Sequence, residues 1–532
     1  MKRIHLLILL FAFITDVYAQ EQFSVSIVPS SITVMPPVHS GAFAEWNGKW
    51  IIIGGRSEGL HNFQSGIAFS SNGRNDSVFV IDPSNNLRWS AAADSLPVDL
   101  FESIFSTNME FYRDSSTLYM IGGFGRQDSI SSWITFPTLA AIDLNGLMSA
   151  VINGTDIAPY FRQVTDSNLA VTGGHLEKID STYYLIFGQR FNGIYDNTIG
   201  SILFNQHYTT EIRKFKIHDN GSSLSISDYS TVQDTDNFHR RDYNLVPQIY
   251  PNDEYGFTAF GGVFQKFANL PYLSPIDIRD TSTHVNSSFN QNLNQYETAS
   301  MPVYDSANNF MHTIFFGGMS LYTYDTLTHA LVQDTLVPFV NTISKVSRDS
   351  LGNLAEYSLP VHMPSLLGSN ARFIADTSVS LLHHGIIDLN ALSGNTKVGY
   401  IVSGIQSDLP NVAGLDPAGM SRANKVVFEI YINKIPDAVQ ELMIKNAVND
   451  LSVYPNPSHG IFNIGFSLNE KEKVEVEIVT VAGKKITTLF EGIAATGFSK
   501  FTWDGSRTKP GTYFCRIKAG TSDKAVKLIL AK

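Results

Sequence analysis

The chain has 532 residues, more than one hydrophobic core usually organises, so we expect two or more domains. Charged residues make up only 16% of it and aromatic residues 12%. Short apolar runs alternate with segments rich in Ser, Thr, Asn, Asp and Gly, which predicts an all-β fold with many turns. The net charge is −11, and no basic cluster stands out beyond Arg240-Arg241, which argues against binding nucleic acid through its phosphates.

The N-terminal residues 1–19 have the pattern of a secretory signal peptide. Lys2 and Arg3 precede an apolar stretch from Leu6 to Ile14, and small residues lead to Ala19, after which we expect cleavage. The alternative is a buried N-terminal helix. No later segment has the length of a membrane-spanning helix, so the mature protein is expected to be soluble after export.

The single cysteine, Cys515, excludes an intramolecular disulfide. It lies in an alternating strand pattern, where a buried small apolar residue is a better interpretation than a reactive thiol.

A short aromatic or aliphatic run that ends in glycine recurs six times. The first two copies are Ile51-Ile52-Ile53-Gly54-Gly55 and Tyr119-Met120-Ile121-Gly122-Gly123, and the closing glycines are Gly55, Gly123, Gly188, Gly262, Gly318 and Gly404. The steps between them are uneven, but each is long enough for a four-stranded sheet and a surface loop. Six copies favour a β-propeller of six blades, with seven possible.

The paired glycines resemble the kelch motif, in which Gly-Gly ends the second strand of a blade. Only Trp89 comes near the aromatic positions that usually follow. The resemblance implies a kelch-type propeller of the galactose-oxidase-like superfamily over residues 20–435. To close the ring, Phe23 to Val28 would pair with the last blade. The alternative is a pair of β-sandwiches.

After a linker at residues 436–449, with a short helix expected around Val439 to Ile444, a second strand series begins. About seven short strands over residues 450–532 predict a small β-sandwich.

Ordered motifs run through this last segment: Tyr454-Pro455-Asn456-Pro457, then Gly460, then Pro510-Gly511 with Tyr513, and a basic final strand. They resemble the type A C-terminal sorting domain of the type IX secretion system of Bacteroidetes. The resemblance implies passage through the periplasm, interaction with the type IX secretion machinery, and a protein that is secreted or attached to the outer-membrane surface. The alternative is an ordinary accessory β-domain.

Motifs for metal or nucleotide chemistry do not occur: there is no HExxH, no paired CxxC and no Walker loop. The GxSxG match at Gly55 to Gly59 lacks the following helix that a nucleophile elbow needs. Oxidases resembling galactose oxidase build their cofactor on a propeller cysteine, which this chain does not have. We therefore expect no metal and no cofactor.

Loop positions near the glycine marks supply candidate ligand-binding side chains, because propellers bind ligands at one end of the central channel. The candidates are His39, Arg56, Arg126, His175, Arg190, Arg241, Asp242 and Arg372.

Two functions remain open: a non-catalytic glycan- or protein-binding module, and an extracellular carbohydrate-active hydrolase, lyase or epimerase. Acidic and basic side chains that converge with shifted pKa values would favour the enzyme. A shallow, neutral, aromatic-rich surface would favour binding.

Overall fold

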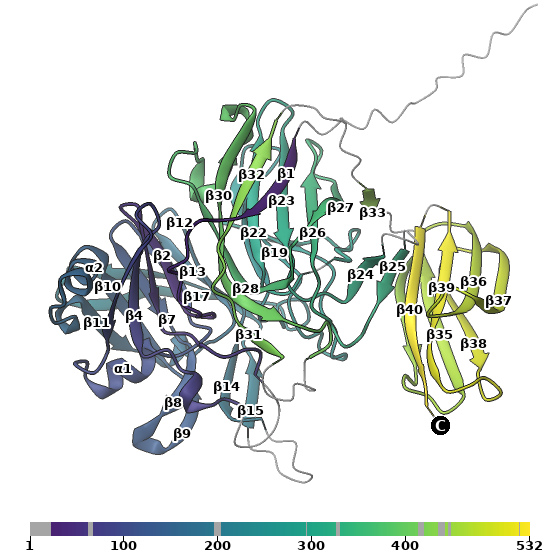
Figure 1. The fold of residues 1–532 in the computed structure, drawn as a ribbon, viewed down its shortest axis with the longest axis horizontal. Coiled ribbons are helices and arrows are strands. Elements are labelled where there is room, and N and C mark those ends of the chain that lie inside the picture. Colours follow the sequence, from purple (N-terminus) through teal and green to yellow (C-terminus); the bar gives the residue numbers. More distant parts are fainter. Residues whose placement is uncertain are drawn as a thin grey trace, which may run out of the picture.

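The computed structural model describes residues 23–61, 68–195, 204–293, 295–325, 330–412, 420–434, 442–444, 448–520 and 522–531. The expected signal peptide lies outside these residues. The described residues form a large propeller and a small C-terminal domain, which is drawn in yellow in Figure 1 and joined to the propeller by a narrow neck.

The propeller has six antiparallel blades of four main strands, and the first three blades follow the chain directly. Blade 1 is β2 (Ala42–Trp46), β3 (Lys49–Ile53), β4 (Ser77–Asp82) and β5 (Leu87–Ala92); blade 2 is β6 (Glu110–Asp114), β7 (Thr117–Ile121), β10 (Thr138–Asp143) and β11 (Phe161–Thr165); blade 3 is β12 (His175–Ile179), β13 (Thr182–Ile186), β16 (Glu211–Asp219) and β17 (Leu224–Gln233).

The other three blades continue the series, and the last one takes its outermost strand from the N-terminal end. Blade 4 is β18 (Asn244–Ile249), β19 (Tyr255–Phe260), β20 (Ile276–Arg279) and β21 (Thr283–Val285); blade 5 is β22 (Ala299–Asp305), β23 (Phe310–Phe316), β26 (Thr342–Arg348) and β27 (Leu354–His362); blade 6 is β28 (Leu366–Ala375), β30 (Asn395–Ser407), β32 (Phe428–Asn433) and β1 (Ser24–Pro29).

The pairing of β1 with β32 closes the ring, from Ser24 opposite Asn433 to Pro29 opposite Phe428. The predicted closing strand is therefore confirmed. Such closure leaves no unpaired edge between the first and last blades and ties the two ends of the propeller together.

Burial explains the apolar runs that precede the glycines. In β3, the residues Trp50, Ile51, Ile52 and Ile53 are all buried, because a central strand of a blade packs against neighbouring blades on both faces. The outermost strands β5 and β17 are mostly exposed. Burial therefore distinguishes the central strands of a blade from its outer edge.

Each glycine mark forms two successive residues with left-handed backbone. Gly54 and Gly55 have φ of 67° and 85°, and Phe187 or Ser403 replaces the first glycine in two blades. The second position is always glycine, because a Cβ on Gly55 would lie 2.3 Å from the carbonyl oxygen of His39.

Additional elements extend the blades. They are the hairpins β8 (Phe124–Gln127) with β9 (Ser132–Thr135), β14 (Gln189–Gly193) with β15 (Phe204–Tyr208), and β24 (Tyr322–Asp325) with β25 (Ala330–Gln333), the short strands β29 (Ile387–Asp388) and β31 (Ser421–Ala423), and the helices α1 (Val98–Ile104) and α2 (Leu144–Asn153).

The C-terminal domain has seven described strands in two sheets around one apolar core that includes the buried Cys515. One sheet holds β34 (Val448–Tyr454), β35 (Ile461–Leu468) and β38 (Gly497–Asp504); the other holds β36 (Glu472–Thr480), β37 (Lys485–Ala494), β39 (Gly511–Ala519) and β40 (Ser522–Leu530). The predicted small β-sandwich is confirmed.

The prediction of a helix in the linker is wrong for the part of that segment that the structure describes. Leu442–Ile444 forms the strand β33, which pairs with β27 at the edge of blade 5, because the unpaired backbone of that edge offers hydrogen bonds to the passing chain. The rest of the expected helix lies outside the described residues.

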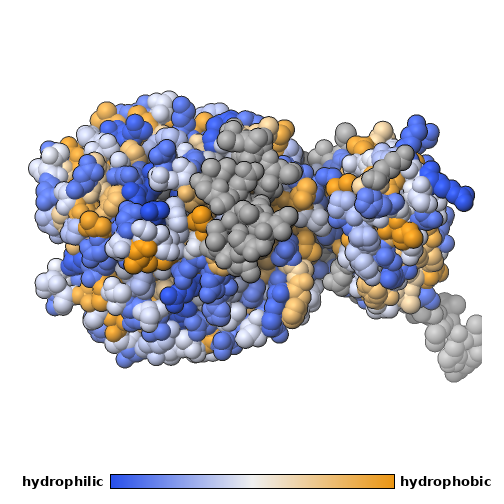
Figure 2. Space-filling view, turned by 90° about the horizontal axis from the view of Figure 1, so that it is seen from below, coloured by the Kyte–Doolittle hydropathy of each residue, from blue (hydrophilic) through white to orange (hydrophobic). Residues whose placement is uncertain are grey.

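A second contact joins the two domains through β25 and β40, which pair in parallel, so the hairpin β24–β25 extends a sheet of the small domain. Viewed from the side of the β8–β9 and β14–β15 hairpins, the surface of both bodies interleaves hydrophilic and hydrophobic residues (Figure 2).

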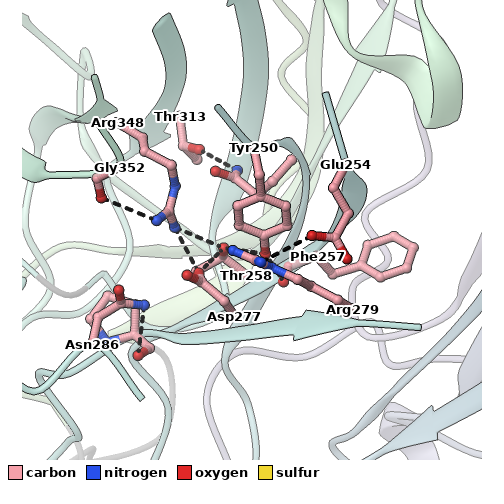
Figure 3. A network of polar contacts seen from close by, with 12 residues as sticks. Tyr250, Glu254, Phe257, Thr258, Asp277, Arg279, Asn286, Thr313, Arg348 and Gly352 are labelled. Carbon is pink, nitrogen blue, oxygen red and sulfur yellow. Dashed lines mark hydrogen bonds and ion pairs between the residues drawn. The ribbon is translucent and has the colours of Figure 1, made fainter. Parts of the chain in front are cut away.

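Blades 4 and 5 share a buried polar network (Figure 3). Arg348 of β26 donates to Asp277 of β20 at 2.6 Å, and the hydroxyl of Thr258 in β19 donates to the same carboxylate oxygen at 2.7 Å. Arg348 and Arg279 both lie over the ring of Tyr250. The network connects the two sheets away from the axis.

Candidate functional site

A ring of six equivalent residues surrounds the propeller axis, one from each blade. Five of them lie two residues before the first strand of their blade, and the sixth lies within β28. All six have positive φ, between 30° and 71°. We call them the axial ring: Ser40, Asn108, Gly173, Asp242, Glu297 and Asn370.

Backbone hydrogen bonds connect neighbouring members of the axial ring across the blades. The N–H of Asn108 donates to the carbonyl of Ser40 at 2.9 Å, that of Gly173 to Asn108 at 3.1 Å, and that of Asp242 to Gly173 at 2.8 Å. Asn370 donates likewise to Glu297 at 2.6 Å. The side chains are therefore held on rigid backbone beside the axis.

On one side of the axial ring lies a cavity of about 90 Å³, which we call the loop cavity because loop residues line most of it. Four members of the axial ring reach it, together with Tyr296 and several aromatic side chains. Phe69, Phe124, Phe191 and Tyr195 form an aromatic cluster there, with ring centroids 4.9 Å apart for Phe69 and Phe124 and for Phe191 and Tyr195.

Three axial-ring residues that line the loop cavity each have a buried side-chain oxygen without a hydrogen-bond partner among the described residues. These oxygens are Oδ1 of Asn108, Asp242 and Asn370. A buried polar atom without a partner loses its hydration and gains nothing in return. All three accept hydrogen bonds, so the cavity favours a ligand that donates several.

The loop cavity also holds a buried pair of opposite charges. The Nε of Arg241 lies 3.5 Å from Oδ2 of Asp242, and the hydroxyl of Tyr296 donates to that same Oδ2 at 2.7 Å. Burial raises the pKa of Asp242, against the opposing effects of Arg241 and the Tyr296 hydroxyl.

His39 lies at the edge of the loop cavity and is neutral at physiological pH. Burial, with the charge of Arg56 beside it, lowers its pKa to about 3. One ring nitrogen is 2.8 Å from the hydroxyl of Ser40 and the other 3.0 Å from the carbonyl of Glu58. His39 is thus fixed by its hydrogen bonds to the loop.

On the other side of the axial ring lies the strand cavity, of about 260 Å³, lined mainly by the first strands of the blades. Burial raises the pKa of Glu110, Glu177 and Glu297 to about 8 each, and burial together with Arg372 lowers that of His175 to about 4. Arg372 lies 3.4 Å from a carboxylate oxygen of Glu297. Ser40 and Asn108 line both cavities.

Six of the eight candidate residues from the sequence line one of the two cavities beside the axial ring. His39, Arg56, Arg241 and Asp242 line the loop cavity, and His175 and Arg372 line the strand cavity. Arg126 lines a third cavity of about 120 Å³ beside β8 and β9. Arg190 is exposed on β14 and lines none of these three cavities.

Sequence reasoning missed the carboxylates of the strand cavity and most of the axial ring. In the first three blades the missed position had a signal, because Ser40, Asn108 and Gly173 stand at the same distance before the closing glycine. Longer insertions in the later blades break that spacing, so Glu297 and Asn370 were not findable in this way.

The motif residues of the small domain have structural roles around its last strand. The side chain of Asn456 donates to the carbonyl of Lys527 at 2.7 Å and accepts from the N–H of Ile529 at 2.8 Å. The hydroxyl of Tyr513 donates to the carbonyl of Lys509 at 2.6 Å. The opening motif therefore secures β40 at the edge of the sandwich.

Residues 452–531 match the family model described as "Secretion system C-terminal sorting domain". This part of the chain is a type IX secretion sorting domain. The sorting domain marks the chain for export to the cell surface or for secretion, and implies interaction with the secretion machinery. Within the described residues, no helix is both long and apolar enough to cross a membrane.

Comparisons over the whole chain add little about function. No curated protein sequence matches. The solved structure of YjhT is 11% identical, with a TM-score of 0.40 over 77% of this chain and 97% of its own. A fungal alcohol oxidase of the AA5 family, in complex with copper, is 9% identical, with a TM-score of 0.37 over 96% of this chain and 100% of its own. At these TM-scores neither structure informs the function.

Proposed function

We propose that this exported propeller is a glycan-binding module that holds a sugar in the loop cavity. The observation that carries the proposal is the set of three unpartnered acceptor oxygens, on Asn108, Asp242 and Asn370, beside the aromatic cluster. Sugar hydroxyls are donors that satisfy such acceptors, and the apolar C–H face of a sugar ring packs on aromatic side chains.

The rigidity of the axial ring supports binding. Its side chains come from backbone that is hydrogen-bonded between blades, so little conformational entropy is lost when a ligand binds. Export supports it too, since a sorting domain brings the propeller to the cell surface or the medium, where glycans are found.

The route of export beyond the sorting domain is part of the same proposal. The charged and apolar pattern of residues 1–19 supports a cleaved signal peptide and passage through the periplasm before the final step. The motif set supports a Bacteroidetes-type protein that is either released or attached to the outer surface.

The test is a glycan array with the whole chain, followed by calorimetry on the best ligand. Asn108→Ala and Asn370→Ala each remove one acceptor, and each should weaken binding about five- to tenfold. Asn395→Ala, at an exposed position at the start of β30, is the matched control and should bind like the parent. Absence of any glycan ligand, or equal binding by all three variants, would contradict the proposal.

A second candidate function is an enzyme that acts by acid–base catalysis on a sugar bound in the strand cavity. The observation that favours it is the strand cavity, where Glu110 and Glu297 carry raised pKa values beside His175 and Arg372. Carboxyl groups that keep a proton near neutral pH can act as general acids. Incubation of the ligand with the chain, with Glu297→Gln as the comparison, decides this: a product formed only by the parent supports an enzyme.

A further inference from the structure

Two consecutive arginines before β18 have opposite environments. Arg240 is fully buried and donates to the carbonyls of Asn237 at 2.8 Å and Gly261 at 3.0 Å, with Tyr272 stacked on its guanidinium. Arg241 is also buried, at 8% exposed, and its backbone N–H donates to the carbonyl of Val263 at 2.8 Å, but its side chain donates no hydrogen bond to any described residue and lines the loop cavity.

Arg56 gives a second contrast, because it lines the same cavity and its side chain is hydrogen-bonded to the protein. Its Nε donates to Glu58 at 2.6 Å and its Nη2 to the carbonyl of Ser70 at 2.5 Å. The nearest charged partner of Arg241 is Asp242, but the 3.5 Å between Nε of Arg241 and Oδ2 of Asp242 is too long for a good hydrogen bond. That Oδ2 already accepts a hydrogen bond from the hydroxyl of Tyr296.

Two aromatic rings also lie beside the guanidinium of Arg241. Its guanidinium carbon lies 5.4 Å from the ring centroid of Phe264 and 6.0 Å from that of Tyr208. Aromatic faces attract a cation but leave most of the five N–H donors without an acceptor. A buried guanidinium in this state is costly unless a ligand supplies acceptor oxygens.

We infer that the sugar bound in the loop cavity carries a carboxylate, and that Arg241 binds it. This rests on the proposed glycan-binding function and names the ligand class. A planar carboxylate accepts two parallel hydrogen bonds from one guanidinium. The three acceptor oxygens of Asn108, Asp242 and Asn370 line the same cavity, so one small ligand can present its acid group to Arg241 and its hydroxyls to these oxygens.

The experiment compares matched acidic and neutral sugars on the whole chain by calorimetry: oligogalacturonate and oligoglucuronate against galacto- and gluco-oligosaccharides of equal length. Acetate, inorganic phosphate and an oligoglutamate peptide are run as competitors. The variants are Arg241→Gln, Arg241→Lys and, as control, Arg190→Gln on the exposed face of β14, each checked by thermal unfolding.

We expect the parent and Arg190→Gln to bind an acidic sugar at least about tenfold more tightly than its neutral counterpart. Arg241→Gln should remove that preference, and Arg241→Lys should keep part of it, because the charge stays but the planar fork is lost. Acetate should compete weakly, since it offers the carboxylate without the hydroxyls.

Three results would overturn the inference while leaving the proposed function in place. The first is equal affinity for neutral and acidic sugars, and the second is a preference for acidic sugars that survives in Arg241→Gln. The third is that neutral sugars bind and no acidic sugar does. Stronger competition by phosphate or by the acidic peptide than by the uronates would overturn it as well. Failure of every sugar to bind would instead overturn the proposed function.

Discussion

The axial ring is built from residues that tolerate a left-handed backbone, with one exception. Ser, Asn, Asp and Gly adopt positive φ at low cost because their side chains are short or absent. Glu297 does so with a φ of 30° and a long side chain, which costs free energy that the surrounding structure must offset. Its place on the lining of the strand cavity, 3.4 Å from Arg372, makes a functional constraint the simplest reason for this strain.

Glu110 is the residue whose titration should be visible in the stability of the whole chain. It is 1% exposed, and one of its oxygens accepts from the N–H of Gly174 at 2.7 Å while the other has no partner among the described residues. Burial raises its pKa from 4.5 to about 8, so the folded chain holds a proton that the unfolded chain releases.

The contribution of Glu110 to stability is therefore fully present below its unfolded pKa and is lost as pH rises toward about 8. Glu110→Gln removes the titration, so its free energy of unfolding should fall less than that of the parent between about pH 5 and pH 8, by on the order of a few kcal/mol. Urea unfolding at both pH values measures this. Glu491→Gln, at an exposed position on β37, should keep the parental slope.

At the scale of elements, the strands were predictable because burial on both faces demands long apolar runs. The apolar run Ile51-Ile52-Ile53, for example, lies in the buried strand β3. The prediction for the linker was wrong because a three-residue strand has almost no signal in the local sequence. The strand β33 forms only because it can pair with the edge strand β27.

The network between blades 4 and 5 should be a major element-level contribution to stability. Asp277→Ala leaves Arg348 buried and unpaired, and we expect a loss of about 3–5 kcal/mol in the free energy of unfolding. Replacing both residues, as Asp277→Ala with Arg348→Met, should recover much of that loss. Chemical denaturation provides the measurement.

The matched control is the exposed pair Arg422–Asp408, whose side chains are about half exposed. Asp408→Ala should change the free energy of unfolding far less, because an ion pair in solvent adds little to stability. Similar losses at both pairs, or no recovery in the double variant, would contradict the view that the buried pair is a clamp between blades.

On the scale of the whole molecule, the sorting domain is attached to its own propeller by more than the linker. Lys524 of β40 is 1% exposed, donates to Asn292 at 2.9 Å and lies over the ring of Tyr322. Lys527 forms an ion pair with Asp334 at 3.1 Å. The final strand of the sorting domain thus lies against the propeller rather than facing solvent along its whole edge.

Lys524→Ala should loosen this contact, because the parallel pairing of β25 with β40 loses its buried anchor. We expect a larger radius of gyration by solution scattering and faster proteolysis between the domains, with unchanged melting of the propeller. Lys500→Ala on β38, in the opposite sheet, should change neither quantity. An unchanged scattering profile for Lys524→Ala would mean that the contact does not hold the domains together.

The sequence by itself determined the repeat, the closing strand and the sorting domain, because each depends on local rules. The sequence alone shows the apolar runs of the central strands, the glycines that follow them and the ordered motifs of the last segment. The three-dimensional structure alone decided which polar side chains meet at the axis and which of them lack partners. Arg56 and Arg241 look alike in the sequence. Only packing shows that Glu58 and Ser70 accept hydrogen bonds from the first, whereas the side chain of the second lines a cavity and donates no hydrogen bond to the described residues.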